Sequence, residues 1–238
     1  MIQQSKATIF LAEERGLKEN GSFRSLQTLH SGNHFNEHKG RVGDIYVMND
    51  DTLDGGCSLN MLVQEYSYII LLPVVGAIHY KDSLGNENLL AAGQVQMLNP
   101  GKGVRIEISN PFKEELVNFL QVWIKAGPVP APAISFLSTY NVNEQPDNLV
   151  RLPPARTNEP ALPVIASIGK FKGRGETVYE LQHNKSIILV FVLEGAFEVE
   201  GRLLHARDGL ALWETKSVEM EALSNDAIVL LIETTGNE

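Results

Sequence analysis

Short runs rich in Val, Ile, Leu and aromatic residues recur along the chain, separated by Gly, Asn or Asp at intervals of roughly 8 to 12 residues. This rhythm is typical of a β-sandwich or β-barrel. The first half predicts strands over 43–49, 58–75, 77–81, 95–98 and 116–125. The second half predicts strands over 177–181, 186–193, 196–199, 210–213, 218–222 and 227–233. The run at 116–125 (LVNFLQVWIK) also fits a short helix by its periodicity, and we predict a strand there.

The two halves of the chain repeat each other. Residues 67–80 (SYIILLPVVGAIHY) and 186–199 (SIILVFVLEGAFEV) align with Gly76 and Gly195 in register. Each segment reads as a buried strand, a glycine turn and an amphipathic return strand, and a second glycine, Gly93 or Gly209, precedes the next apolar strand. Because closure removes the exposed edges of antiparallel sheets, the repeat predicts an all-β fold of two jelly-roll-like barrels of one design.

Proline usage predicts the boundary between the two barrels. Eight of the eleven prolines lie between Ala126 and Pro163. Since proline cannot donate a hydrogen bond to a β-ladder, we interpret this stretch as a connector. The predicted organisation is a first barrel over 1–126, a connector over 127–165 and a second barrel over 166–238.

Composition limits the partners and the compartment. The 238 residues carry 20 Lys and Arg against 29 Asp and Glu, a net charge of −9, and 43% are hydrophobic. An acidic chain without a basic run disfavours direct binding to nucleic acid or to anionic membranes. A single cysteine, Cys57, excludes an internal disulfide, and the N-terminal residues do not resemble a secretory signal. The longest apolar run, 68–77, is shorter than the roughly 20 residues of a membrane span. We expect a cytoplasmic protein.

Several short motifs of the first half carry a family resemblance. They are Asn49-Asp50-Asp51, Asp82-Ser83-Leu84-Gly85-Asn86, Gly101-Lys102-Gly103, Asn110-Pro111 and Trp123. With these motifs on a two-barrel pattern, the chain resembles the pirin family of bicupins, which contain two cupin (double-stranded β-helix) barrels. Its members include flavonol (quercetin) dioxygenases and a eukaryotic nuclear transcription cofactor. Residues 25–35 resemble the family's next upstream segment in degraded form, and the second half resembles the family loosely.

The resemblance implies a metal, typically iron, held in the first barrel by a His-x-His pair and a His-x-Glu pair on facing strands. Residues i and i+2 of a strand point to one face, so this spacing brings four ligands together. Aligned without gaps, the four positions fall on Leu62, Gln64, Ile106 and Ile108. None is a normal ligand, so we expect no metal and no other cofactor. A one-residue slip would bring Glu65 and Glu107 forward, but it would turn the neighbouring side chains to the wrong face.

The same strands predict a candidate pocket. Strand parity places four residues on one face, with two isoleucines opposite them: Leu62, Gln64, Tyr66, Tyr68, Ile106 and Ile108. This set is either a filled barrel core or a small apolar pocket in which an amide and two phenols orient a ligand. Glu65 and Glu107 are expected to point away from it.

Other candidate residues have a simpler interpretation. His30, His34 and His38 have helical spacing for a metal site, but the glycines and asparagines among them favour a loop. His183 aligns with Gln64 in the repeat and lacks companion ligands, and His79 is expected to be hydrogen-bonded or exposed. We expect Cys57 to be buried and inert rather than redox-active, and Gly101-Lys102-Gly103 to form a tight turn rather than a phosphate-binding loop.

These observations favour one function and leave two alternatives. The leading hypothesis is a metal-free, non-catalytic bicupin that binds a small aromatic or apolar molecule, or a protein partner. The first alternative is a quercetin 2,3-dioxygenase-type enzyme, as the family resemblance implies. The second is a metal-independent cupin isomerase that uses a tyrosine with a base. No catalytic residue is assigned.

Overall fold

A computed structural model describes residues 5–29, 40–127, 133–152, 163–182 and 186–235. Within these ranges the chain forms 21 strands and one short 3-10 helix, Ala12–Glu14. It divides into two compact units. The first barrel comprises residues 15–41 and 45–140, and the second comprises residues 1–14, 42–44 and 141–238.

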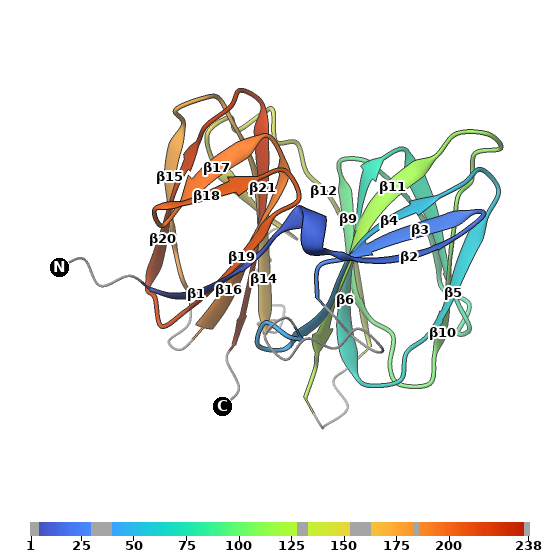
Figure 1. Cartoon of the computed structure of the whole chain (residues 1–238). Coiled ribbons are helices and arrows are strands. Elements are labelled where there is room, and N and C mark those ends of the chain that lie inside the picture. The colour runs from blue at the N-terminus through green and yellow to red at the C-terminus, as the bar shows by residue number, and fades with distance from the viewer. Residues whose placement is uncertain (1–4, 30–39, 128–132, 153–162, 183–185, 236–238) are drawn as a thin grey trace. The chain divides into compact units, whose positions relative to one another are not determined.

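The first barrel consists of two antiparallel sheets, which Figure 1 shows in blue to yellow. The larger sheet has the order β12 (Ile134–Thr139), β9 (Gln94–Asn99), β6 (Ser67–Val75), β11 (Val117–Lys125), β4 (Ile45–Leu53), β3 (Phe23–Gln27) and β2 (Gly16–Asn20). The smaller sheet has the order β5 (Ser58–Leu62), β10 (Arg105–Ser109), β7 (Ala77–Asp82) and β8 (Glu87–Ala91).

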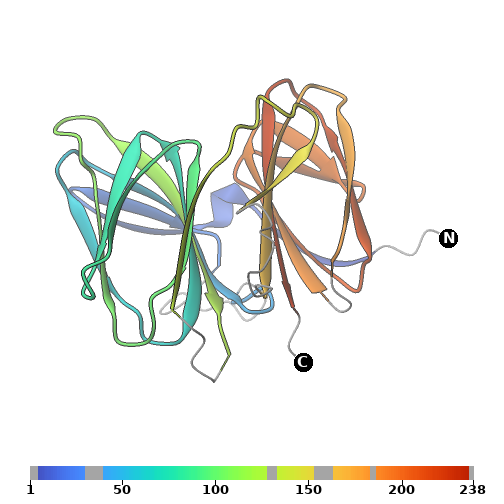
Figure 2. The ribbon, with the colours of Figure 1, turned by 180° about the vertical axis from the view of Figure 1, so that it is seen from behind.

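The second barrel also consists of two antiparallel sheets, seen from behind in Figure 2. The larger sheet has the order β1 (Lys6–Phe10), β19 (Gly209–Trp213), β16 (Ser186–Glu194), β21 (Ala227–Thr235), β14 (Val164–Phe171) and β13 (Leu149–Leu152). The smaller sheet has the order β15 (Glu176–Glu180), β20 (Ser217–Ala222), β17 (Ala196–Val199) and β18 (Arg202–His205).

The strand orders confirm the internal repeat. The run β9-β6-β11-β4 of the first barrel corresponds to β19-β16-β21-β14 of the second, and β5-β10-β7-β8 corresponds to β15-β20-β17-β18. Gly76 and Gly195 occupy equivalent turns with φ values of 76° and 77°. A side chain at either position would be strained, because this left-handed region suits glycine. The all-β, two-barrel prediction is therefore confirmed.

The predicted domain boundaries were wrong at the N-terminus and in the connector. Strand β1 pairs with β19 and so belongs to the second barrel, although it lies in the range assigned to the first. The proline-rich range is not only a connector, because β12 pairs with β9 of the first barrel and β13 pairs with β14 of the second. All three are edge strands of their sheets, where neighbouring prolines are tolerated.

The predicted strands are otherwise found, with one exception that bears on the site. The range 116–125 is strand β11 and not a helix. The range 58–75 divides into β5 and β6, and residues 63–66 between them are not in a strand. Strand parity therefore cannot be carried across the break, and a side-chain direction inferred from one side of it does not hold on the other.

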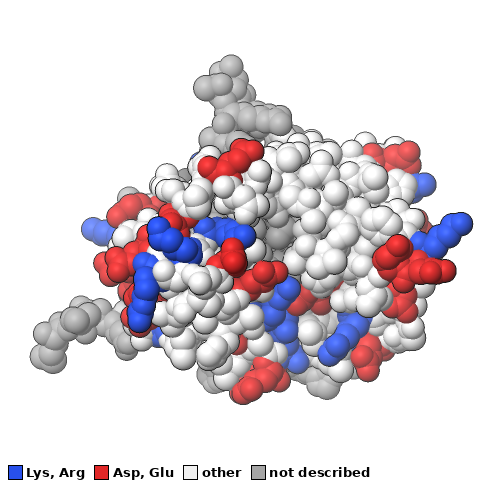
Figure 3. All heavy atoms as spheres, turned by 90° about the horizontal axis from the view of Figure 1, so that it is seen from above, with Lys and Arg blue, Asp and Glu red and all other residues white. Residues whose placement is uncertain are grey.

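Two further features concern the surface charge and the helices of the molecule. Acidic and basic side chains are interspersed on the face shown in Figure 3. In the part of the chain that the structure describes, no helix has the length and apolar character needed to cross a membrane.

Candidate functional site

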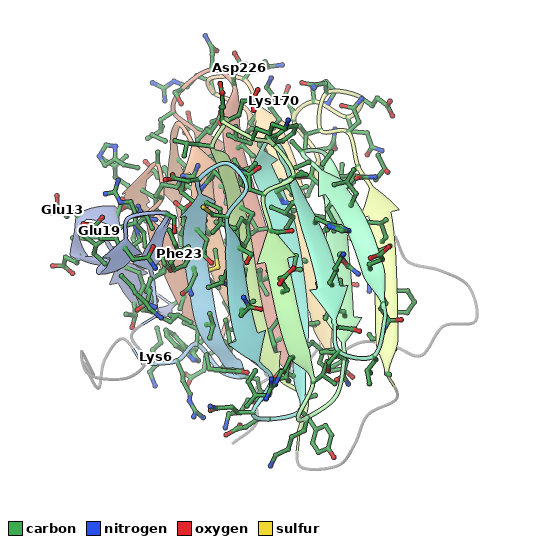
Figure 4. All side chains as sticks on the ribbon, turned by 90° about the vertical axis from the view of Figure 1, so that its right-hand side faces the viewer. Lys6, Glu13, Glu19, Phe23, Lys170 and Asp226 are labelled. Atoms are coloured by element: carbon green, nitrogen blue, oxygen red, sulfur yellow. The ribbon has the colours of Figure 1, made fainter. Side chains whose placement is uncertain are left out.

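The first barrel contains a cavity of about 500 Å³ between its two sheets. One part of its wall is aromatic and apolar, with side chains from β3, β4, β5 and β11; Figure 4 labels Phe23, which comes from the β2–β3 hairpin. The rest of the wall is polar. The lining residues are Lys18, Phe23, Ser25, Gln27, Tyr46, Val47, Asn49, Leu59, Asn60, Met61, Leu62, Gln64, Glu65, Gln121 and Trp123.

Strand pairing places polar side chains in rows across the larger sheet. On β4, Asn49 pairs with Gln121 of β11 and with Gln27 of β3. Two residues further along β4, Asp51 pairs with Ser25 of β3. Side chains at i and i+2 of a strand share a face, so both rows face the interior of the barrel.

A hydrogen-bonded chain runs along this wall to a buried carboxyl group. Trp123 Nε1 donates to Gln121 Oε1 at 2.7 Å, and Gln121 Nε2 donates to Asp51 Oδ2. The two bonds fix the orientation of the Gln121 amide. Asp51 has no solvent-exposed surface, so this series of hydrogen bonds connects the cavity wall to a fully buried acid.

Burial raises the pKa of Asp51 to about 6. The neighbouring Asp50 carboxylate raises this pKa further, whereas hydrogen bonding by Ser25 and Gln121 and the charge of Lys18 lower it. The influence of Ser25 comes from proximity rather than from a well-directed bond, because Ser25 Oγ and Asp51 Oδ1 are both buried without a hydrogen bond of good geometry.

The adjacent acid, Asp50, has a different environment. Its side chain points to the opposite face of β4, where Arg15 Nη1 lies 3.1 Å from Oδ2 and Asn118 Nδ2 lies 2.6 Å from Oδ1. The cation compensates the buried charge of Asp50. The groups hydrogen-bonded to Asp51 are neutral, so Asp51 is the acid whose charge is costly.

An aromatic corner forms another part of the cavity wall. The rings of Tyr46 and Trp123 meet edge to face with centroids 6.3 Å apart. The Tyr46 hydroxyl lies 2.7 Å from Ser67 Oγ, and Ser67 in turn donates to the Glu65 carbonyl oxygen at 3.0 Å. Burial raises the pKa of Tyr46, so its phenol remains protonated at neutral pH.

The predicted pocket is only partly correct. Ile106 and Ile108 are buried in the first-barrel core, as expected. Leu62 and Gln64 are exposed at the rim of the cavity, and the Leu62 side chain is 51% exposed. The predicted convergence of all six residues was wrong.

The two tyrosines of that prediction do not line the cavity. Tyr66 lies in the break between β5 and β6. Tyr68 lies on the opposite face of β6 from the core residues Ile69 and Leu71. The physical reason is the break at 63–66: the alternation of inward and outward side chains along β5 does not continue into β6.

The pairing of β5 with β10 corrects the register by one residue. Met61 pairs with Ile106, and Leu59 pairs with Ile108. Both residues of β5 pack against the core, as does Val63 just beyond the strand. The positions that face the two isoleucines are therefore Leu59, Met61 and Val63 rather than Leu62 and Gln64.

The residues present do not fit the family's metal. The facing positions of β5 and β10 offer aliphatic side chains and one thioether, with no imidazole or carboxylate. Glu65 forms an ion pair with Lys125 at 2.9 Å, and Glu107 lies on the opposite face of β10 from Ile106. Among the described residues, no group of three or more His, Cys, Asp or Glu side chains is arranged to hold a metal ion.

The remaining candidates lie away from the cavity or beyond the described ranges. His30, His34, His38 and His183 are outside the described residues. His79 is half-buried on β7 and pairs with Leu89. Cys57 is half-buried rather than buried, which corrects that expectation. Gly101-Lys102-Gly103 forms the expected turn, with positive φ at both glycines.

Sequence reasoning missed the polar wall of the cavity. A signal for it exists in β11, where Gln121 interrupts an otherwise apolar run two residues before Trp123. Two residues apart on a strand, they share a face, and a glutamine on a buried face needs a partner. That partner, Asp51, comes from β4 and could not be chosen without the pairing of the strands.

Two barrels, each built from two antiparallel sheets with the same strand order, define a bicupin. Comparison with protein-family models agrees. A model described as Pirin matches residues 14–124, and one described as Quercetinase C-terminal cupin domain matches residues 164–234. The chain belongs to the pirin family.

Known relatives match nearly the whole chain or most of it at low sequence identity. A quercetin 2,3-dioxygenase from Escherichia coli is 24% identical over 226 residues, covering 92% of this chain and 95% of the relative. A pirin-like protein from Caulobacter vibrioides is 27% identical over 194 residues, covering 79% and 83%. The crystal structure of YhhW from Escherichia coli superimposes with a TM-score of 0.83 at 18% identity, covering 98% and 99% of the two chains. A structure of YhhW in complex with nickel(II) gives 0.80 at 19% identity, covering 98% and 100%.

Proposed function

We propose that the first barrel binds a small, partly aromatic molecule in its cavity without the help of a metal ion. The supporting observation is the composition of the cavity. Trp123 and Tyr46 form an aromatic corner beside the polar row that leads to Asp51, whereas the positions facing Ile106 and Ile108 are apolar. A volume of about 500 Å³ lies within the range of ligand-binding pockets.

The donor set argues for a metal-free site. A divalent site of this kind needs three or four N, O or S donors at about 2.0 to 2.3 Å. Met61 offers a neutral thioether, and Leu59, Val63, Ile106 and Ile108 offer no donor at all. A divalent ion placed between them would lose hydration without replacement, at a large cost in free energy.

The second candidate function is a quercetin 2,3-dioxygenase activity. The relatives favour it, since one from Escherichia coli with this name aligns with nearly the whole chain. The residues of the cavity do not favour it, because the chemistry attributed to the family uses a bound metal. Quercetin-dependent oxygen uptake distinguishes the two functions.

Titration calorimetry with indole tests the proposed binding. Indole is an aromatic probe of suitable size with one hydrogen-bond donor, and we expect it to bind equally well with and without EDTA. Val47→Phe, which places a ring in the cavity, should abolish binding. Val75→Phe, at a valine of the same barrel that is 56% exposed and does not line the cavity, is the matched control and should bind normally.

The outcomes separate the two functions. Binding that is insensitive to EDTA and lost only in Val47→Phe supports the metal-free site. Binding that requires added iron or nickel, together with quercetin-dependent oxygen consumption, would establish the dioxygenase instead. Indole binding that survives Val47→Phe would place the ligand outside the cavity.

A further inference from the structure

Ser25 links the buried acid Asp51 to the cavity from β3, as Gln121 does from β11. It lines the cavity wall, and its position on β3 pairs with Asp51 on β4. Its side chain is 1% exposed, and Ser25 Oγ and Asp51 Oδ1 both lack a well-directed hydrogen bond. Ser25 also lowers the pKa of Asp51 as a hydrogen-bonding neighbour, so the two side chains satisfy each other in part. Because a hydroxyl group makes more than one hydrogen bond, Ser25 Oγ keeps the capacity for a further partner on the cavity side.

The chemistry of a hydroxyl group determines what this partner can be. A serine hydroxyl has one donor hydrogen and two acceptor lone pairs. Next to an ionised Asp51, which only accepts, the Ser25 hydrogen turns toward Oδ1 and a lone pair faces the cavity. Next to a protonated Asp51 that donates from Oδ1, the Ser25 oxygen accepts from the acid and its hydrogen is free to face the cavity.

We propose that Ser25 and Asp51 form a hydrogen-bonding subsite of the first-barrel cavity whose polarity is set by the protonation of Asp51. With Asp51 ionised, the subsite accepts a hydrogen bond and selects ligands with an N–H or O–H donor. With Asp51 protonated, the subsite donates and selects ligands with a carbonyl or ether acceptor. The proton is exchanged with solvent, and the Ser25 O–H bond rotates without breaking. This subsite rests on the proposed function, because it requires a ligand in the cavity.

The neighbouring charges are compatible with such a switch. Asp50 stabilises the protonated form of Asp51 and Lys18 the ionised form, and Arg15 compensates Asp50 from the other face of β4. On β11 the neighbours are the neutral Gln121 and Phe119, which pairs with Asp51. Burial sets the pKa of Asp51 near 6, so both forms are reached at moderate pH.

Three bicyclic probes of nearly equal size test the proposal by titration calorimetry. Indole carries a donor, 1-indanone carries an acceptor, and indene carries neither. None of them titrates between about pH 5 and about pH 7, on either side of the pKa of Asp51. We expect indole affinity to rise about fivefold with pH over this range and 1-indanone affinity to fall about fivefold, because each gains or loses one hydrogen bond. Indene affinity should stay nearly constant.

Two variants assign the effect to the two residues. Ser25→Ala removes the link and should leave the indole and 1-indanone profiles parallel. Asp51→Asn removes the titration and should make all three profiles flat. The wild-type profiles decide the matter by themselves if a variant does not fold.

The outcomes distinguish this subsite from the proposed function. If indole and 1-indanone bind with parallel pH profiles, the subsite is wrong while the cavity remains a binding site. If opposite profiles persist in Ser25→Ala, another group is responsible and the subsite is again wrong. If none of the three probes binds, both proposals fail.

Discussion

Among the described residues, two carboxyl groups on the larger sheets are almost completely buried, Asp51 in the first barrel and Glu233 in the second, and they have different surroundings. In the second barrel, Glu233 is 1% exposed and accepts hydrogen bonds from the Tyr179 hydroxyl at 2.7 Å and Ser186 Oγ at 2.6 Å. The backbone N–H of Gln182 donates to it as well, at 3.0 Å. In the first barrel, Asp51 has Oδ1 without a well-directed bond and lies behind the wall of a cavity.

The internal repeat makes this comparison position by position. Ile69 of β6 aligns with Ile188 of β16, and their partners on the next strand are Trp123 and Glu233. Likewise, Ser67 aligns with Ser186; the first hydrogen-bonds to Tyr46 and the second to Glu233. At equivalent positions of the same fold, the first barrel therefore has Trp123 in its cavity wall, and the second barrel has Glu233, a carboxyl group with hydrogen-bond donors to its oxygens.

The interiors of the two barrels also differ in their polarity. Among the described residues, sixteen buried hydrophobic side chains form the core of the second barrel, including Val190, Leu212 and Leu231. The first barrel has a core of the same kind, including Ile69, Ile106 and Phe119, but Asn49 and Gln121 also lie beside its cavity. A buried carboxyl group whose oxygens are all hydrogen-bonded within the protein stabilises the fold. A carboxyl group beside a cavity, with one oxygen that lacks a well-directed hydrogen bond, is suited to a ligand.

The largest effect is expected at Glu233. Replacing it by alanine, Glu233→Ala, leaves the donors of Tyr179, Ser186 and Gln182 buried without an acceptor. We expect the free energy of unfolding to fall by about 4 kcal/mol, measured by urea denaturation. Glu221→Ala, which removes a surface ion pair with Arg174, is the control and should change stability by about 0.5 kcal/mol or less. Equal effects of the two variants would contradict a structural role for Glu233.

The next effect is a pH dependence of stability from Asp51. Its pKa is raised to about 6 by burial, so the folded state holds the proton more tightly than the unfolded state. The stability contributed by this proton is therefore present at low pH and is lost as pH rises from about 4 through about 6. The loss should reach about 3 kcal/mol.

Denaturation of wild type and Asp51→Asn across this pH range isolates that contribution. The difference between their free energies of unfolding should change with pH in the stated direction. Two parallel curves would show that Asp51 does not titrate in this window, and the switch at Ser25 would then lose its basis.

The smallest effect compares one leucine from each interior. Leu212 is fully buried in the second-barrel core, so Leu212→Ala should cost about 3 kcal/mol. Leu59 is partly buried and already borders the first-barrel cavity, so Leu59→Ala should cost about 1 kcal/mol. Urea denaturation of both variants measures the difference. Equal costs would mean that the first barrel is as tightly packed as the second.

The sequence predicted the scaffold better than the site. The repeat around Gly76 and Gly195 is local and periodic, so the two barrels could be inferred from it. The cavity depends on which strands pair, and the polar row from Gln121 to Asp51 joins residues 70 positions apart. No pattern within either strand identifies that pairing.

The metal positions show why strand parity alone was not enough. The interpretation of 58–75 as one strand assigned the inward positions to Leu62 and Gln64, and the break at 63–66 moved them to Met61 and Val63. The facing positions inferred from strand parity were therefore displaced by one residue on β5 and correct on β10. The expectation that metal ligands are missing is unaffected, because neither pair of side chains resembles the family's histidines.

Elemental analysis tests the metal-free first barrel most directly. Wild type expressed with iron and nickel in the medium should contain no stoichiometric metal. The combined variant Met61→His, Val63→His, Ile106→His and Ile108→Glu should bind a full equivalent, because it places the family's pattern on the observed register. A matched variant with Leu62→His and Gln64→His in place of the first two changes should not. A full equivalent of metal in the wild type, lost on mutation of the first barrel, would contradict the account.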